Sequence, residues 1–171
     1  MIGFGRIGLA SLGLLAACLV ATAALVAAAA EVPDAIAAKG ETVVLELHAQ
    51  GAQVYECKAD SSGQLTWQFR EPIAALFRNG ATIGRHYGGP SWESGGGVVV
   101  AKLAGRAPAS NAADIPWLKL DISERRGDGP WKDATTIQRI NTKGGSLAGK
   151  CEKAGSLHSE AYSADYVFLR K

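Results

Sequence analysis

Beyond residue 31 the chain consists of short segments in which apolar and polar residues alternate, separated by glycine-rich or polar turns. This period of two is typical of antiparallel strands that bury one face and expose the other to water. Val43, Leu45 and Leu47, for example, fall on one side of a single segment. We therefore predict an all-β domain, either an antiparallel sandwich or a closed barrel of about eight strands joined by long loops.

The turns set the predicted bounds of the elements. Strands are expected at residues 42–49, 52–58, 65–70, 81–87, 97–103, 116–123, 134–141 and 162–169. Because only Gln50-Gly51 separates the first two segments, they are predicted to form a hairpin. Loops are expected at residues 105–114, 127–130 and 143–160, and helical turns only at residues 33–38 and 71–77. The length suits one domain, which we place at residues 31–171.

The first thirty residues have the pattern of an export signal. Arg6 is their only charged residue, and an apolar run follows it as far as the small residues Ala28-Ala29-Ala30. This order predicts a signal peptide at residues 1–30 and a periplasmic or extracellular domain after it. Two alternatives remain open: an uncleaved membrane anchor, and lipidation of Cys18 in the lipobox-like Leu15-Ala16-Ala17-Cys18. Only these alternatives would attach the protein to a membrane.

The two later cysteines fit an oxidising compartment. Once Cys18 leaves with the signal, Cys57 and Cys151 form an even pair and are predicted to be joined by a disulfide. Two separate buried thiols are the alternative. The formal net charge of +2 falls further when Arg6 is removed, so nothing indicates a nucleic acid as partner.

Neither a cofactor nor a metal is expected. Gly3-Phe4-Gly5-Arg6-Ile7-Gly8 matches a dinucleotide fingerprint, but no strand can precede it. Residues 144–151 resemble a phosphate-binding loop in which Cys151 replaces the required hydroxyl. The three histidines are scattered along the chain, and the cysteines are assigned to a bridge.

A glycine-rich segment carries the first candidate site. His86, Tyr87, Trp92 and Glu93 flank Gly88-Gly89-Pro90, where the backbone can approach a ligand. His86 and Glu93 can form an acid–base couple, and the aromatic rings offer stacking area. The alternative is a tight hairpin whose aromatic side chains cap the core and whose histidine bonds a backbone carbonyl.

Arg139 and Asn141 form the second candidate site. Strict alternation places both on one face of a predicted strand, with Gln138 and Ile140 on the other face. Arg139 can present its guanidinium fork to an anionic ligand. Pairing with an internal carboxylate, Glu93 or Asp165, is the alternative.

Several motifs along the domain resemble one known family. They are Val32-Pro33, Trp67 and residues 51–57, 84–93, 115–118, 137–145 and 162–168. Together they resemble the secreted bacterial and fungal family catalogued as domain of unknown function 3455, over residue 32 to the C-terminus. The resemblance implies one exported, mostly β domain with cysteines at the family's positions and no established activity. Where the family usually has an Asp-Gly-Ser turn after Trp92-Glu93, this chain has Ser94-Gly95-Gly96.

We predict an exported β-domain of unknown activity, a binding or envelope-associated structural module. Its expected partner is a small molecule, a glycan or an envelope component. Two or more of the four tryptophans exposed on one face would provide a sugar-binding platform. The alternative is a hydrolase-type or metal-assisted enzyme that uses His86, Glu93 and Arg139. Convergence of these three side chains in one pocket would favour the enzyme.

Overall fold

The structure is a computed structural model that describes residues 1, 3 and 31–171. Apart from Met1 and Gly3, the predicted signal peptide lies outside the described residues, and so does the lipobox cysteine, Cys18. The expectations about them stay predictions. Within the part of the chain that the structure describes, no helix has both the length and the hydropathy needed to cross a membrane.

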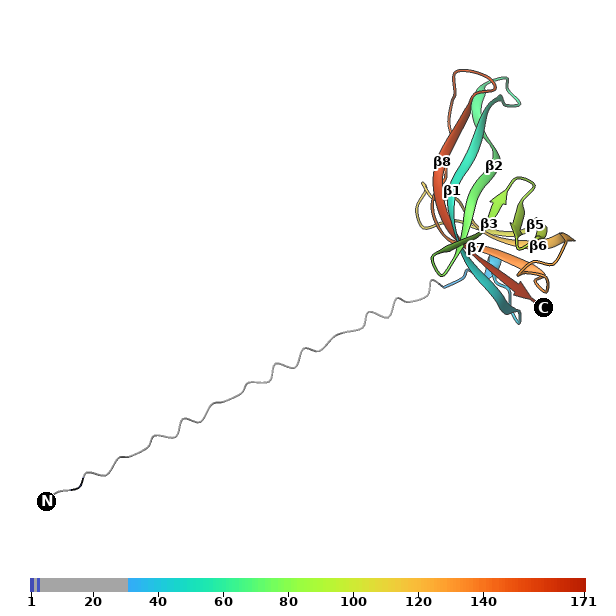
Figure 1. The fold of residues 1–171 in the computed structure, drawn as a ribbon. Helices are drawn as coiled ribbons and strands as arrows, with labels where there is room; N and C mark the ends of the chain where they lie inside the picture. The colour runs from blue at the N-terminus through green and yellow to red at the C-terminus, as the bar shows by residue number, and fades with distance from the viewer. Residues whose placement is uncertain (2, 4–30) are drawn as a thin grey trace.

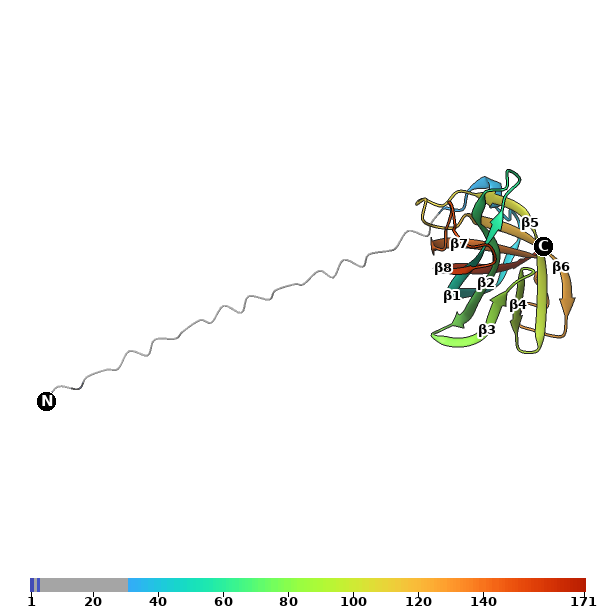
Figure 2. The same cartoon turned by 90° about the horizontal axis from the view of Figure 1, so that it is seen from above.

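Eight antiparallel strands form one closed barrel (Figures 1 and 2). Each strand pairs with its neighbours in the chain, and β8 pairs with β1 to complete the ring. The all-β prediction is confirmed, and of the two architectures left open the protein adopts the barrel. The strands are β1 (Thr42–Ala59), β2 (Leu65–Arg78), β3 (Ala81–Tyr87), β4 (Ser91–Ser94), β5 (Gly97–Ala107), β6 (Trp117–Arg126), β7 (Thr136–Gly144) and β8 (Leu157–Arg170).

The predicted hairpin around Gly51 is wrong, because the chain continues through this glycine as the single long strand β1. Gly51 pairs with Ala74 on β2, and a Cβ atom at position 51 would collide with the Ile73 carbonyl and with Ala74. The glycine therefore permits a close approach of two strands. The absent side chain that suggested a turn serves tight strand packing here.

The helical turn predicted at residues 71–77 is also wrong, since this segment belongs to β2. Ala74 and Leu76 are buried and alternate with more exposed neighbours, and the segment pairs with β1 on one side and β3 on the other. Long-range pairing therefore overrides the local helical tendency. The other predicted turn is confirmed as a short 3₁₀ helix, η1 (Asp34–Ile36).

Two loops are shorter than predicted. Strand β5 extends to Ala107 and strand β8 begins at Leu157, so both strands include residues expected in loops. Strand β4 was not expected at all, because its four residues lie between a Gly-Gly-Pro turn and a run of three glycines. Its pairing with β3 turns the glycine-rich segment into a β-hairpin.

The η1 segment covers part of the outside of the barrel. Ile36 is fully buried, and its carbonyl accepts a hydrogen bond of 2.7 Å from the Gln138 side chain on β7. Lys119 of β6 donates to the Ala37 carbonyl at 3.3 Å. Gln138 therefore anchors the N-terminal segment on the outer surface while Arg139, the next residue, points inward.

The barrel interior holds an aromatic core. Trp131, in the loop before β7, stacks on Phe168 of β8 with 5.1 Å between ring centroids, and Trp92 meets Phe168 edge-on at 6.3 Å. Aliphatic side chains from the surrounding strands pack against these rings; among them are Leu45, Leu47, Leu76, Val99, Leu120 and Ile137. These core side chains mark which residues of each strand face the interior of the barrel. Only side chains on that face can reach a cavity inside it.

Strands β1, β2 and β8 project beyond the shorter strands, and the disulfide lies in this projecting part (Figure 1). Cys57 near the end of β1 and Cys151 in the β7–β8 loop are within bonding distance, with 5.8 Å between their Cα atoms. Backbone hydrogen bonds flank the bridge, from Cys57 N to Ser156 O and from Cys151 N to Leu65 O. The predicted pairing is therefore confirmed, and it fastens the loop to the β1–β2 hairpin.

Candidate ligand-binding cavity

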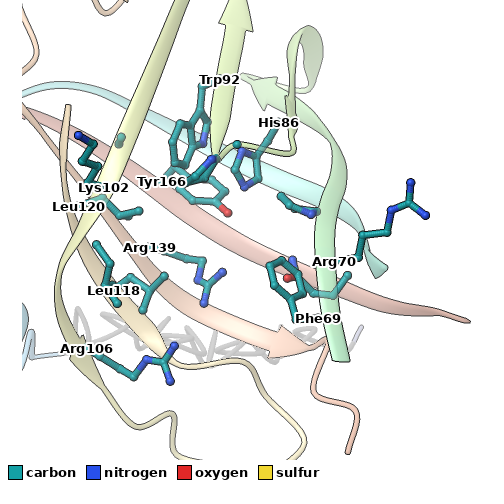
Figure 3. A pocket seen from close by; sticks show the side chains of 16 residues that line it. Phe69, Arg70, His86, Trp92, Lys102, Arg106, Leu118, Leu120, Arg139 and Tyr166 are labelled. Carbon is teal, nitrogen blue, oxygen red and sulfur yellow. The ribbon is translucent and has the colours of Figure 1, made fainter. Parts of the chain in front are cut away.

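A cavity of about 420 Å³, open to solvent on one side, extends into the barrel beside the aromatic core, and all eight strands contribute to its lining. Its walls are mainly apolar, with a few polar groups at specific places (Figure 3). The lining residues are Gln53, Phe69, Arg70, Pro72, His86, Gly89, Pro90, Trp92, Ala101, Lys102, Leu103, Arg106, Leu118, Leu120, Arg139 and Tyr166. Of the six predicted ligand-binding residues, three meet here: His86, Trp92 and Arg139.

Three aromatic rings, joined by one stacked and two edge-on contacts, form a deeply buried part of the cavity wall. His86 on β3 and Trp92 on β4 are cross-strand partners, and their rings stack with centroids 4.3 Å apart and planes 16° from parallel. Tyr166 of β8 meets both rings edge-on, at 5.0 Å and 5.3 Å. All three side chains are at least 97% buried, with exposed fractions of 3%, 1% and 1%. They form a rigid surface against which a ligand can lie.

His86 is a neutral imidazole in this environment. Burial is the main cause that lowers its pKa, to about 3, and the positive charge of Arg139 acts in the same direction. The hydrogen bond with the Ser91 carbonyl, 2.8 Å from Nδ1, opposes this shift. Nδ1 therefore carries the proton, and Nε2 is an acceptor. The alternative interpretation, a hairpin whose histidine bonds a backbone carbonyl, is confirmed by this contact.

Arg139 is a partly buried cation in the wall of the cavity. It lies on β7 between Leu118 of β6 and Tyr166 of β8. Its Nε and Nη2 donate to the Pro116 carbonyl at 3.1 Å and 2.8 Å. Figure 3 shows its guanidinium pointing into the space below the Tyr166 hydroxyl. Within residues 31–171 we find no ion pair for Arg139.

Several buried polar atoms of the lining have no hydrogen-bond partner among the described residues. They are Gln53 Nε2, Trp92 Nε1 and the Tyr166 hydroxyl, and the hydroxyl of Tyr162 beside the cavity is unpartnered too. Burial raises the pKa of both tyrosines, and the nearby Arg139 partly opposes the rise. Arg139 and Tyr162 lie close enough to the Tyr166 hydroxyl, and Gln53 to the Tyr162 hydroxyl, for weak hydrogen bonds of less than ideal geometry. Such groups are available to a ligand.

Glu93 and Tyr87 do not join this cavity, although their chain neighbours do. Arg85 donates to Glu93 Oε2 at 2.9 Å, and the Tyr87 hydroxyl donates to the same oxygen at 3.1 Å. These contacts lower the pKa of the Glu93 carboxyl, with the Arg85 hydrogen bond as the largest cause. All three side chains extend from the outer face of the β3–β4 hairpin. His86, Glu93 and Arg139 therefore do not converge in one pocket.

Asn141 also lies apart from Arg139, which corrects the prediction that they share a face. Its backbone has φ of 51°, and the β7–β8 register is interrupted between residues 140 and 143. Its amide donates to Asp165 Oδ2 at 2.9 Å, while Asp165 Oδ1 lies 2.8 Å from His48 Nδ1. These residues line an external groove of about 590 Å³. Asp165 is therefore not the partner of Arg139, and neither is Glu93.

The cavity lining is basic. Arg70, Lys102, Arg106 and Arg139 belong to it, and among the described residues no aspartate or glutamate does. Arg70 pairs with Glu56 and Glu71 and extends away from the cavity in Figure 3. Within the described part of the chain, no group of three or more His, Cys, Asp or Glu side chains is arranged to hold a metal ion. The cavity lining is therefore suited to a ligand group that carries negative charge or accepts hydrogen bonds.

One protein family has a sequence profile that matches this chain. Residues 37–170 match the family described as Protein of unknown function (DUF3455). The chain belongs to this family. The resemblance seen in the sequence motifs is thereby confirmed, and the DUF3455 match covers all eight strands and both cysteines of the barrel.

No curated protein and no solved structure matches the chain. The chemistry of this DUF3455 domain is therefore argued from its cavity. Sequence reasoning missed Gln53, Tyr166 and Leu118 as lining residues. A usable signal existed for Tyr166, because alternation in the predicted strand at residues 162–169 places it on the same face as Tyr162 and Phe168. That this face borders a cavity follows only from the closure of the barrel.

Proposed function

We propose that this DUF3455 domain is an exported binding protein that holds a small, largely apolar molecule in the barrel cavity. The observation that carries the proposal is an internal cavity with aromatic and aliphatic walls and a few buried polar atoms that lack partners. Small-molecule sites have this composition, and their volumes are about 300–1,000 Å³. A barrel of eight strands is wide enough to hold one small ligand.

The geometry gives less support to the other functions considered. Glu93 is on the outer face, so the histidine, glutamate and arginine of the enzyme hypothesis are not assembled. A glycan platform would need exposed tryptophans. Trp92 and Trp131 are buried and Trp67 and Trp117 are partly buried, so none of the four, all within the described residues, is exposed. Binding of a small molecule inside the barrel would use the aromatic and aliphatic walls and the buried polar atoms of the cavity.

Binding can be tested with a neutral, apolar fluorescent probe, N-phenyl-1-naphthylamine. The purified protein should increase its fluorescence with saturation at one probe per chain. Ala101→Phe places a ring in the cavity, since Ala101 is a buried lining residue, and is expected to reduce probe affinity about tenfold or more. Leu118→Phe provides a second cavity-filling variant if the first is unstable.

The matched control is Ala104→Phe, an exposed position on the same strand outside the cavity lining. It should bind the probe as the unmodified protein does. Equal losses of probe affinity in the control and in the cavity-filling variants would contradict binding inside the barrel. Absence of saturable fluorescence in the unmodified protein would contradict the proposed function as a whole.

Export is supported by the N-terminal sequence and by the confirmed cysteine pair. Fractionation of cells that express the full chain should recover the protein outside the cytoplasm with its N-terminus at Glu31. Mass spectrometry of the recovered protein distinguishes this outcome from lipidation at Cys18 and from an uncleaved anchor. An intact N-terminus on cytosolic protein with both later thiols reduced would contradict export.

A further inference from the structure

The unpaired charge of Arg139 is a feature that binding of a purely apolar molecule does not explain. Its guanidinium is partly buried, and its hydrogen-bonding neighbours within the described chain are neutral: the Pro116 carbonyl and, more weakly, the Tyr166 hydroxyl. Removing a charged group from water is costly unless an opposite charge pairs with it. No carboxylate of the described residues lines the cavity, so an anionic group of a ligand can supply this opposite charge.

The neighbouring polar atoms reinforce this charge preference. Trp92 Nε1 is buried without a partner among the described residues, and Gln53 Nε2 has only a weak contact with the Tyr162 hydroxyl. Indole and amide nitrogens can only donate hydrogen bonds. The buried Tyr166 hydroxyl, whose contacts with Tyr162 and Arg139 are weak, can donate as well. His86 adds no second positive charge, because its pKa of about 3 keeps it neutral. One cation with several donors complements a ligand group that carries a single negative charge and acceptor oxygens.

The remaining lining is suited to a hydrocarbon chain. Leu118 is a cross-strand neighbour of Arg139, and Leu120 continues the same inward face of β6. Phe69 and Leu103, with exposed fractions of 55% and 56%, continue the apolar lining toward solvent. In Figure 3 the Arg139 guanidinium lies below Tyr166 and to the left of Phe69. An anionic group beside Arg139 can therefore be continued by an apolar chain along the wall.

We propose that the cavity takes a single-chain monocarboxylate whose carboxylate pairs with Arg139 inside the barrel. The hydrocarbon chain lies against Leu118, Leu120 and Phe69. This inference rests on the proposed function and names the ligand class of the same cavity. A carboxylate could instead pair with an exposed lining cation such as Lys102 or Arg106. The inference assigns it to Arg139, which is partly buried and shielded by the barrel wall.

The test compares two ligands of equal chain length, dodecanoate and dodecan-1-ol, below their micelle concentrations at about pH 8, where the acid is ionised. Each displaces N-phenyl-1-naphthylamine from the purified protein. Dodecanoate is expected to bind about tenfold more tightly than the alcohol. Arg139→Gln should abolish this preference and leave the affinity for the alcohol unchanged. Arg139→Lys, which keeps the charge without the fork, should retain part of the preference.

Two further measurements locate the carboxylate. Arg85→Gln, on the outer face of the barrel wall, is the matched control and should keep the full preference. The preference should also persist in about 0.5 M salt, because a shielded pair is screened less than an exposed one. If Arg139→Gln does not fold, Arg139→Lys and the salt titration decide the question.

The outcomes separate this inference from the proposed function. Probe binding together with equal affinities for acid and alcohol would overturn the carboxylate assignment and leave small-molecule binding intact. Loss of the preference in Arg106→Gln but not in Arg139→Gln would place the carboxylate at the exposed edge and overturn the inference. Loss of the preference at high salt would do the same. Absence of any probe binding would contradict the proposed function itself.

Discussion

The two faces of the β3–β4 hairpin differ although their residues are neighbours in sequence. His86 and Trp92 face the interior, where burial keeps the imidazole neutral. Arg85 and Glu93 face outward and form an exposed ion pair. The same short segment thus supplies part of a cavity wall and a solvated surface cluster. Strand alternation decides the chemical environment of each residue more strongly than its position in the chain does.

Removal of the disulfide, which fastens the β7–β8 loop to the β1–β2 hairpin, should have the largest effect on stability. Cys57 is fully buried, and the bridge spans 94 residues. Reduction is expected to lower the free energy of unfolding by about 4 kcal/mol because it frees the unfolded chain. Urea denaturation with and without reductant measures the change, with a Cys57→Ser, Cys151→Ser variant as the control that should not respond. Two titratable thiols in the untreated protein would contradict the bridge.

Truncating the interior aromatic ring should come next. Trp92→Ala removes a side chain that is 1% exposed and packs against His86, Tyr166 and Phe168. A loss of about 3 kcal/mol in the free energy of unfolding is expected from the lost burial and the enlarged cavity. Tyr87→Ala on the outer face of the same hairpin should cost clearly less. Similar losses of unfolding free energy in the two variants would mean that the inner and outer faces of the hairpin contribute equally to stability.

Acid should affect the interior through His86. Its folded-state pKa of about 3 lies below the unfolded value of about 6.5, so below pH 6.5 the unfolded chain binds a proton that the folded protein excludes. Stability should therefore fall as the pH decreases through this window, by roughly 2 kcal/mol between pH 6 and pH 4. His86→Phe keeps a ring in place and should remove this part of the acid sensitivity. Identical pH profiles for both proteins would show that His86 is protonated freely in the folded state.

The smallest effect is expected on the outer face. Arg85 and Glu93 are solvent-exposed, and an exposed ion pair contributes little because water and salt screen it. Glu93→Gln should leave the urea midpoint of the protein unchanged within the precision of the measurement. It should also leave probe binding unchanged, since Glu93 does not line the cavity. A loss comparable to that of Trp92→Ala would place Glu93 in the structural or binding interior.

Much of the secondary structure was accessible to sequence reasoning, because alternation is a local property. Six of the predicted segments fall largely within observed strands of their own. Gly51 and residues 71–77 misled the prediction for a common reason: both lie where β1 and β2 pair closely, and this pairing outweighs local preference. Strand β4 escaped notice because its four residues carry too short a pattern to stand out from the flanking glycines.

The candidate site was only partly predictable. His86, Trp92 and Arg139 were selected for their side-chain chemistry, and the barrel brings them together at one cavity. Asn141 was assigned to the face of Arg139 by strict alternation, which fails at the irregularity after Ile140. Glu93 was grouped with His86 because residues 86–93 were expected to form one glycine-rich loop. The hairpin instead places them on opposite faces of the wall.

The sequence alone was sufficient for the class of fold, the family and the pairing of the two later cysteines. The fold class depends on a period of two that the longer strands display by themselves, the family on its motifs, and the cysteine pairing on the even number of cysteines left after the export signal. Only the tertiary structure decided between barrel and sandwich, the members of the cavity and the neutrality of His86. Barrel closure pairs β1 with β8, from opposite ends of the domain. Burial and the field of Arg139 act through space, so the state of each cavity residue depends on neighbours that its own segment does not contain.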